Sequence, residues 1–138
     1  MSPRRTAVPG DPAQLPILTR FLQEFWAAAN LPPAHALNFE LALEEVFMNI
    51  VMHGSQPGVA PSVEVSLALA DNGLTMTVED NGPLFNPLTV PSPDLTSSLT
   101  ERPVGGLGVF LVRQLMDAVS YSRVDARNRL TMSKSLAN

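Results

Sequence analysis

The sequence predicts a single α/β domain in which helices cover one face of a β-sheet. Two stretches with apolar residues at helical spacing come first, and two pairs of stretches that alternate apolar and polar residues follow. A third helical stretch separates the two pairs. Alternating strands give a sheet one apolar face, which helices must cover. The length of 138 residues fits one domain, residues 1–138.

Two helices are predicted in the first half of the chain. Asp11 can cap the first one, and the proline after it suits the first helical position. Apolar residues then recur at helical spacing to about Ala29, and the break at 30–33 contains two prolines. The second helix is predicted over 34–53. Gly54 is expected to end it in the left-handed conformation that glycine often adopts after a helix.

The sheet is expected to contain two hairpins and a short strand at its edge. Asp71-Asn72-Gly73 is a tight hairpin signal, and a second turn is predicted at 126–128. A third helix is predicted after the glycine-rich segment 105–108. The predicted strands are 6–8 at the edge, then 63–69, 74–79, 119–124 and 129–133.

The second helix carries a polar pair on an otherwise apolar surface. Glu45 and Asn49 are one turn apart and share a face at the margin of the apolar stripe, where a cleft can reach them. An amide oxygen can ligate Mg²⁺, and a carboxylate can act as a base or hold a water. The alternative is an ordinary solvated helix edge. Leu41, Met48 and Met52 lie on the far side of the main apolar stripe.

Residues 80–87 and 105–108 are each only weak evidence of a binding site when taken alone. Residues 80–87 place an acid before a glycine turn, although a plain turn also explains them. Backbone amides at 105–108 can bind phosphate, although glycines often serve as simple helix breakers. Their spacing fits neither the Walker motif nor the dinucleotide fingerprint. The loop 88–104 between the two segments is long enough to be a functional lid or a disordered segment.

His53 directly precedes Gly54 at the end of the second helix. It can bond the last carbonyls of the helix or gain from the helix dipole. A metal role needs His, Asp or Glu partners at suitable spacing, and none is obvious in the sequence. The residues by themselves therefore favour a structural role for His53.

Composition excludes several classes of function. Nine basic residues and a net charge of −4 argue against direct binding of nucleic acid or of an anionic membrane. The absence of cysteine excludes disulfides, thiolate metal sites and cysteine nucleophiles. No apolar run approaches the roughly 20 residues that span a bilayer. The N-terminus has no apolar stretch of the kind found in signal peptides, so a cytoplasmic location is expected.

Taken in order, three motifs resemble a known family. They are Glu-x-x-x-Asn at 45–49, continuing to His53-Gly54, then Asp-x-Gly-x-x-Phe-Asn-Pro at 80–87 and Gly-Gly-Leu-Gly at 105–108. Asn-Arg-Leu-Thr at 128–131 also matches. This order resembles the GHKL (Bergerat-type) ATPase domain, and more specifically the small anti-sigma serine/threonine kinases of the RsbW type. The resemblance extends from about residue 11 to the end of the chain.

The resemblance implies a fold, two cofactors and a set of site residues. The fold is a two-layer sandwich with a mixed, mostly antiparallel sheet and helices on one face. ATP and Mg²⁺ are the implied cofactors, with Glu45 as general base and Asn49 as metal ligand. Asp80 would accept a hydrogen bond from the adenine amino group, Gly82 would let the purine approach, and 88–104 would form the ATP lid. The other implied nucleotide-binding residues are His53, Phe85, Arg102, Gly105, Gly106, Leu107, Gly108 and Val109.

The leading hypothesis is an ATP- and Mg²⁺-dependent anti-sigma kinase that phosphorylates serine or threonine on a STAS-domain anti-anti-sigma partner. A sigma factor is the second partner that the resemblance implies, and a homodimer is left open. Glu45 favours a kinase, because a pure binding module needs only Asn49. The loop 88–104 holds Arg102 and no lysine, which motivates the alternative of a nucleotide-gated binding module without kinase activity.

Two other hypotheses are weaker. The catalytic part of a two-component histidine kinase is disfavoured, because the chain has no room for a helix pair carrying a phosphoacceptor histidine. A plain α/β domain that binds no nucleotide remains the null hypothesis.

Overall fold

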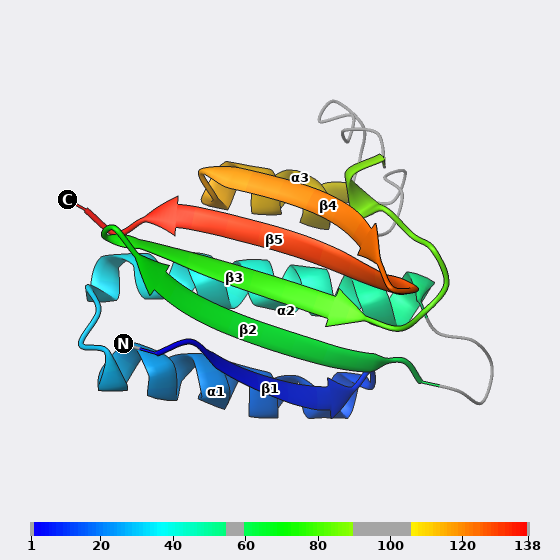
Figure 1. The fold of residues 1–138 in the computed structure, drawn as a ribbon, viewed down its shortest axis with the longest axis horizontal. Helices are drawn as coiled ribbons and strands as arrows, with labels where there is room; N and C mark the ends of the chain where they lie inside the picture. The colour runs from blue at the N-terminus through cyan, green and yellow to red at the C-terminus, as the bar shows by residue number, and fades with distance from the viewer. Residues whose placement is uncertain (1, 55–59, 90–105, 138) are drawn as a thin grey trace.

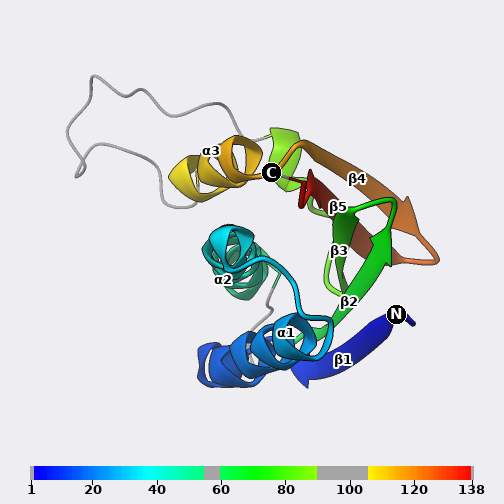
Figure 2. The same cartoon turned by 90° about the vertical axis from the view of Figure 1, so that its left-hand side faces the viewer.

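A computed structural model describes residues 2–54, 60–89 and 106–137. The described elements form two layers, a β-sheet and a layer of three helices on one of its faces (Figures 1 and 2). The helices are α1 (Leu15–Ala28), α2 (Ala36–His53) and α3 (Gly106–Leu115). The strands are β1 (Arg4–Pro9), β2 (Ser62–Ala70), β3 (Gly73–Asp80), β4 (Ala118–Val124) and β5 (Arg127–Ser135). Short 3₁₀ turns are η1 (Pro12–Gln14), η2 (Pro33–His35) and η3 (Pro87–Thr89).

The sheet has the strand order β1-β2-β3-β5-β4. Every pairing between the described strands is antiparallel, which refines the predicted mixed sheet. Asp71 and Asn72 both have positive φ in the turn between β2 and β3, as the hairpin signal predicted. The pairing of β3 with β5 sets Asp80 directly opposite Asn128. Two residues 48 positions apart in the sequence therefore meet at one end of the sheet.

Alternation along the strands determines which face is buried. In β3 every second residue is buried from Leu74 to Asp80, and the residues between them are half-buried. The buried strand residues pack against α1 and α2 in one continuous core. Figure 2 shows α2 between α1 and α3, on the same side of the sheet. The predicted arrangement of helices over one apolar sheet face is confirmed.

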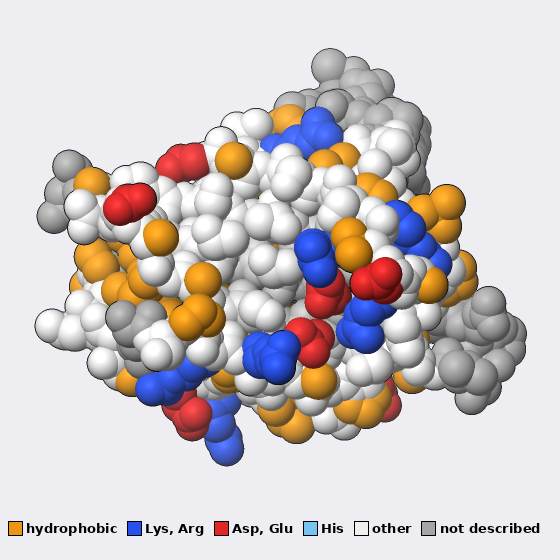
Figure 3. All heavy atoms as spheres, viewed as in Figure 1, with side chains coloured by type: hydrophobic (Ala, Val, Ile, Leu, Met, Phe, Trp, Pro, Cys, Tyr) orange, Lys and Arg blue, Asp and Glu red, His pale blue; other side chains and the backbone are white. Residues whose placement is uncertain are grey.

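The other sheet face is polar. Figure 3 views this face, where uncharged side chains and backbone dominate and charged side chains gather near the middle. Arg129 Nε donates to Glu79 Oε1 at 2.7 Å, and Arg5 Nη1 lies 4.0 Å from Glu64 Oε1. No helix among the described residues is long and apolar enough to cross a membrane.

Two local predictions are wrong. Gly54 has φ of −97°, so it is not left-handed. A Cβ at Gly54 would lie 2.8 Å from the Ile50 carbonyl oxygen, so close packing explains the glycine. The second hairpin turns at Asp125 and Ala126, which have positive φ, and β5 begins directly after them. The edge strand β1 is also longer than predicted.

Candidate functional site

A small cavity lies between the helix layer and one end of the sheet. Its volume is about 30 Å³. Three polar or charged side chains are buried in the described part of the chain, namely Asn49, Asp80 and Asn128, and all three line this cavity. Burying a polar side chain costs free energy unless the side chain makes hydrogen bonds or binds a ligand. Their concentration at one cavity marks it as the candidate site.

Asp80 ends β3 and presents its carboxylate to the cavity. Its Oδ1 accepts hydrogen bonds from the Gly82 amide at 2.9 Å and from Asn128 Nδ2 at 3.1 Å. Among the described residues, Oδ2 has no hydrogen-bond partner. The site therefore holds one carboxylate oxygen fixed and leaves the other as an acceptor for a ligand that donates a hydrogen bond.

Asn128 is the centre of the hydrogen-bond network around Asp80. Its Nδ2 donates to Asp80 Oδ1 and, at 2.8 Å, to the Pro83 carbonyl oxygen. Its Oδ1 accepts from Tyr121 Oη at 2.6 Å, from Arg123 Nη1 at 3.1 Å and from the Phe85 amide at 3.2 Å. Both amide hydrogens and the carbonyl oxygen are thus used by the protein. Asn128 positions Asp80 and the following turn instead of contacting a ligand through free groups.

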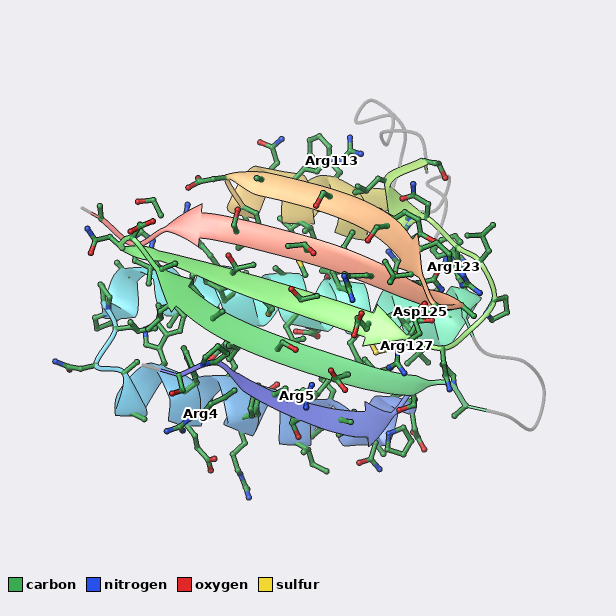
Figure 4. The ribbon with its side chains drawn as sticks, in the orientation of Figure 1. Arg4, Arg5, Arg113, Arg123, Asp125 and Arg127 are labelled. Atoms are coloured by element: carbon green, nitrogen blue, oxygen red, sulfur yellow. The ribbon has the colours of Figure 1, made fainter. Side chains whose placement is uncertain are left out.

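Arg123 extends this network to the turn after β3. Its Nη1 also donates to the Gly82 carbonyl oxygen at 3.1 Å. Figure 4 shows Arg123 and Arg127 at the end of the β4–β5 hairpin, beside the end of β3. The hairpin therefore supports the turn from the side of β4.

Gly82 permits a close approach between this turn and the end of α2. A Cβ at Gly82 would lie 2.7 Å from the Gly54 carbonyl oxygen and 2.9 Å from Asp80 Oδ1. Contacts below 3.0 Å are not tolerated without movement, and one partner here is backbone. Glycine is thus required at position 82 by packing against the backbone at the end of α2.

Asn49 and Glu45 lie one turn apart on α2, as predicted. Asn49 is buried and lines the cavity, whereas Glu45 is half-buried one turn towards the N-terminus. Burial raises the pKa of the Glu45 carboxyl above its ordinary value of 4.5, and the adjacent charge of Glu44 raises it further. A raised pKa strengthens a carboxylate as a proton acceptor.

The donor set suits a magnesium ion bound together with phosphate. Mg²⁺ takes oxygen ligands and usually keeps several waters, so one protein oxygen plus phosphate oxygens is a common arrangement. The Asn49 side-chain oxygen can supply that ligand, because the side chain makes no hydrogen bond to another described residue. No cluster of three or more His, Cys, Asp or Glu side chains occurs within residues 2–54, 60–89 and 106–137. A metal held by the protein alone is therefore not supported there.

Aromatic and apolar side chains close the cavity. The rings of His53 and Phe85 stack, with centroids 4.9 Å apart and planes 20° from parallel. Phe85, Pro87 and Leu88 line the cavity. Arg113 of α3 donates from Nη2 to the Leu88 carbonyl oxygen at 3.0 Å, which ties η3 to that helix.

The model of the histidine kinase-like ATPase domain family matches residues 8–134 of this chain. The chain belongs to this family. The result confirms the resemblance drawn from the three motifs, and membership of an ATPase domain family implies that the domain binds ATP.

Two curated relatives of the histidine kinase-like ATPase domain are similar over most of the chain. The serine/threonine-protein kinase BtrW of Bordetella bronchiseptica is 33% identical over 118 residues, which are 84% of this chain and 78% of BtrW. An anti-sigma F factor of Clostridium perfringens is 25% identical over 100 residues, which are 72% of this chain and 71% of that protein.

A solved structure shares the fold. The structure of the RsbU and RsbW domains of Rv1364c from Mycobacterium tuberculosis superimposes with a TM-score of 0.70 at 16% identity. The match covers 100% of this chain and 33% of the Rv1364c chain. At this identity the likeness shows the fold of the ATPase domain alone.

The structure brings together some of the predicted site residues of this ATPase domain and leaves others untested. Asn49, Asp80 and Phe85 line one cavity, and Gly82 and His53 lie against residues that line it. Gly106, Leu107, Gly108 and Val109 open α3, which contacts α2. Arg102, Gly105 and lid residues 90–104 lie outside the described residues.

The sequence analysis missed three residues of the hydrogen-bond network around Asp80, namely Asn128, Tyr121 and Arg123. Asn128 occurs in a segment that matched the family pattern, but the sequence predicted a turn there. Its role depends on the register between β3 and β5, which places it opposite Asp80. No spacing signal connects residues so far apart in the chain.

Proposed function

We propose that this chain is an ATP- and Mg²⁺-dependent serine/threonine protein kinase of the anti-sigma type. It would phosphorylate a serine or threonine of a STAS-domain anti-anti-sigma protein and bind a sigma factor in exchange. The observation that carries the proposal is the joint burial of Asn49, Asp80 and Asn128 around one cavity, with Glu45 one turn from Asn49. The names of two relatives, the serine/threonine-protein kinase BtrW and the anti-sigma F factor, also support this proposed function.

The adenine end of the site is assigned to Asp80. Its Oδ2 accepts a hydrogen bond from the adenine amino group, while Asn128 and the Gly82 amide hold Oδ1 in place. An ionised carboxylate accepts hydrogen bonds and cannot donate them. Guanine presents a carbonyl where adenine has its amino group, so this arrangement favours adenine.

The phosphate end is assigned to α2 and α3. Bound Mg²⁺, ligated by Asn49, would neutralise charge on the phosphates. Backbone amides at the start of α3, around Gly106 and Gly108, are suited to bind phosphate oxygens at the positive end of the helix dipole. The start of α3 is thus assigned the phosphate-binding role that the glycine-rich sequence predicted.

Glu45 is assigned the proton transfer. The partner's hydroxyl oxygen attacks the γ-phosphorus, the bond to the bridging oxygen of ADP breaks, and the hydroxyl proton moves to the Glu45 carboxylate. General-base catalysis of this kind contributes about 10²–10⁴-fold to rate. The raised pKa of Glu45 supports this role.

A transfer assay tests the proposal. The chain is incubated with Mg²⁺, ATP labelled on the γ-phosphate and a STAS-domain protein from the same genome. Wild type should label the partner, and Glu45→Ala should slow labelling by about 10²–10⁴-fold. Glu24→Ala is the matched control, because Glu24 is an exposed glutamate of α1 outside the cavity lining, and it should retain transfer.

Two outcomes would count against this kinase. Labelling that is equally fast in Glu45→Ala would remove Glu45 from the mechanism. No labelling, together with an ATP-dependent change in partner affinity, would favour the second candidate, a nucleotide-gated binding module. Loop 88–104, with Arg102 and no lysine, is the observation that favours that candidate.

A homodimer is a further part of the proposal. β1 is an edge strand, so one side of its backbone is unpaired with any described strand. An exposed strand edge can pair with another chain. Sedimentation of the free protein would reveal the predicted dimer.

A further inference from the structure

Helix α2 carries apolar residues on two opposite sides. Its buried side packs against the sheet, and α1 and α3 contact its flanks (Figure 2). A second row of apolar residues follows the opposite side, and we call it the outer stripe. At about 100° of rotation per residue, its members fall within an arc of roughly 60°. The outer stripe consists of Leu37, Leu41, Met48 and Met52.

The outer stripe lies mostly outside the core, and of its four residues only Met48 packs against the core cluster. Leu37 is 60% exposed and Met52 is 47% exposed, and Leu41 and Met48 are half-buried. A helix in a two-layer domain ordinarily carries polar residues on its solvent side. A row of exposed apolar residues indicates an interaction surface, and methionine adapts well to different partners. The predicted nucleotide cavity leaves this stripe without a role.

Acidic residues border the outer stripe on both sides. By helical rotation, Glu40 and Glu44 lie on the side towards α1, and Glu45 lies on the other side. The bond from Gln23 Nε2 of α1 to Glu40 Oε1, 3.1 Å long, agrees with this placement. Together α1 and α2 carry four glutamates and one arginine, so they hold three of the four net negative charges of the chain.

The acidic borders determine which kind of partner can bind the outer stripe. In a two-fold dimer the same surface meets itself, which would bring the acidic borders of two copies together. An anionic lipid surface would be repelled by the same carboxylates. A helix with an apolar row and basic flanks complements both the stripe and its borders.

We propose that the outer stripe of α2 is a docking surface for a basic amphipathic helix of a partner protein. Apolar side chains of that helix, at spacing i, i+4, i+7 and i+11, cover Leu37, Leu41, Met48 and Met52. Its lysines and arginines face Glu44 on one border and Glu45 on the other. The docked helix thereby lies along the same helix as the proposed catalytic carboxylate. The inference goes beyond the proposed kinase and does not require phosphate transfer.

Peptide binding measured without nucleotide tests this surface. The probe is a fluorescein-labelled helical peptide as long as α2, 18 residues, with leucines at i, i+4, i+7 and i+11 and lysines beside them. A second peptide carries glutamate in place of every lysine. Fluorescence anisotropy should show that the lysine peptide binds wild type and that the glutamate peptide binds at least about tenfold more weakly.

Protein variants locate the binding surface. The double variant Leu37→Ser, Met52→Ser should weaken binding of the lysine peptide at least about tenfold, as expected when two contacts worth more than about 1 kcal/mol are lost. Ile17→Ser is the matched control, since Ile17 of α1 is also exposed, at 51%, and lies outside the stripe. It should bind as wild type does. All these side chains are exposed, so the variants should fold.

Several results would overturn the proposal. They are equal binding of both peptides, undiminished binding by the double variant, or wild-type binding to phosphatidylserine vesicles that the double variant loses. A dimer of the wild type that dissociates in the double variant would assign the stripe to a second copy. ATP binding by the double variant should equal that of wild type, so failure of this proposal is distinguishable from failure of the kinase proposal.

Discussion

Among the residues of the proposed site, Glu45 on α2 is the one whose pKa is shifted by its surroundings. Burial and the charge of Glu44 raise its pKa. Because the folded state then binds the proton more tightly than the unfolded state does, the charged carboxylate destabilises the fold at higher pH. The proposed general-base role needs that charged form, so under this proposal the basicity of Glu45 is gained at some cost in stability.

This leads to a prediction for Glu45→Gln. The variant should be more stable than wild type well above pH 4.5, where Glu45 is charged, and the gain should vanish at lower pH, where both forms are neutral. Melting temperatures of both proteins from pH 4 to pH 8 measure the difference. The phosphate-transfer rate of wild type should also rise with pH, with a midpoint above 4.5. A stability difference that is independent of pH would contradict the raised pKa.

At the scale of elements, Asn128 joins strands that are distant in sequence. Its side chain connects β5 to Asp80 of β3, to Tyr121 and Arg123 of β4, and to the turn after β3. The cavity wall therefore depends on strand register as much as on any single ligand-binding side chain.

The substitution Asn128→Asp tests whether Asn128 acts through its hydrogen bond to Asp80 or only by filling space. It keeps the shape and the accepting oxygen, but it replaces a donor to Asp80 with a second carboxylate. ATP affinity should fall at least about tenfold at pH 7.5, because a hydrogen bond to a charged group is worth about 1.5–3 kcal/mol. Isothermal titration should also show partial recovery towards pH 5, as the carboxylate pair takes up a proton.

Asn81→Asp is the control for this change. Asn81 Oδ1 accepts from the Ser62 amide at 2.8 Å, and an aspartate can keep that bond. Its ATP affinity should stay close to wild type. Equal losses in both variants would indicate a general effect of added charge instead of a role for Asn128.

The turn between β3 and η3 supplies a second prediction at this scale. Gly82→Ala forces a Cβ to within 2.7 Å of the Gly54 carbonyl oxygen, so the turn must move away from α2. The free energy of unfolding should fall by about 1–3 kcal/mol, the usual cost of overpacking. Gly73→Ala is the matched control, because its Cβ would meet only ordinary contacts at 3.4 Å or more. Urea denaturation that gives equal stabilities for the two variants would contradict this account.

For the whole molecule, ligand binding should appear as a gain in stability. A ligand that binds only the folded state at 100 times its Kd adds about 2.7 kcal/mol, which corresponds to a rise in Tm on the order of 10 °C for a domain of this size. Mg-ATP should raise the Tm of wild type by this amount. Asn49→Ala should lose the part of the shift that depends on Mg²⁺ and should match wild type when EDTA is present.

The same measurement bears on two hypotheses. An unchanged Tm of wild type with Mg-ATP would favour a domain that binds no nucleotide. Equal shifts in wild type and Asn49→Ala with Mg²⁺ would remove Asn49 from the proposed metal site and would not bear on the proposed recognition of adenine by Asp80.

The sequence by itself determined the layers, most element boundaries and the order of the family motifs. Alternation with period two and helical spacing depend on neighbouring residues, so local patterns reveal them. The face shared by Glu45 and Asn49 follows from helical spacing alone, and the hairpin at Asp71 follows from its turn residues.

Only the tertiary structure decided which distant groups meet. The register of β3 against β5 placed Asn128 beside Asp80, and the packing of the turn against the end of α2 requires glycine at position 82. It also left the outer stripe of α2 exposed, because the sheet needs only one side of that helix. Contacts between segments far apart in the chain depend on how whole elements pack, and local sequence patterns do not contain that information.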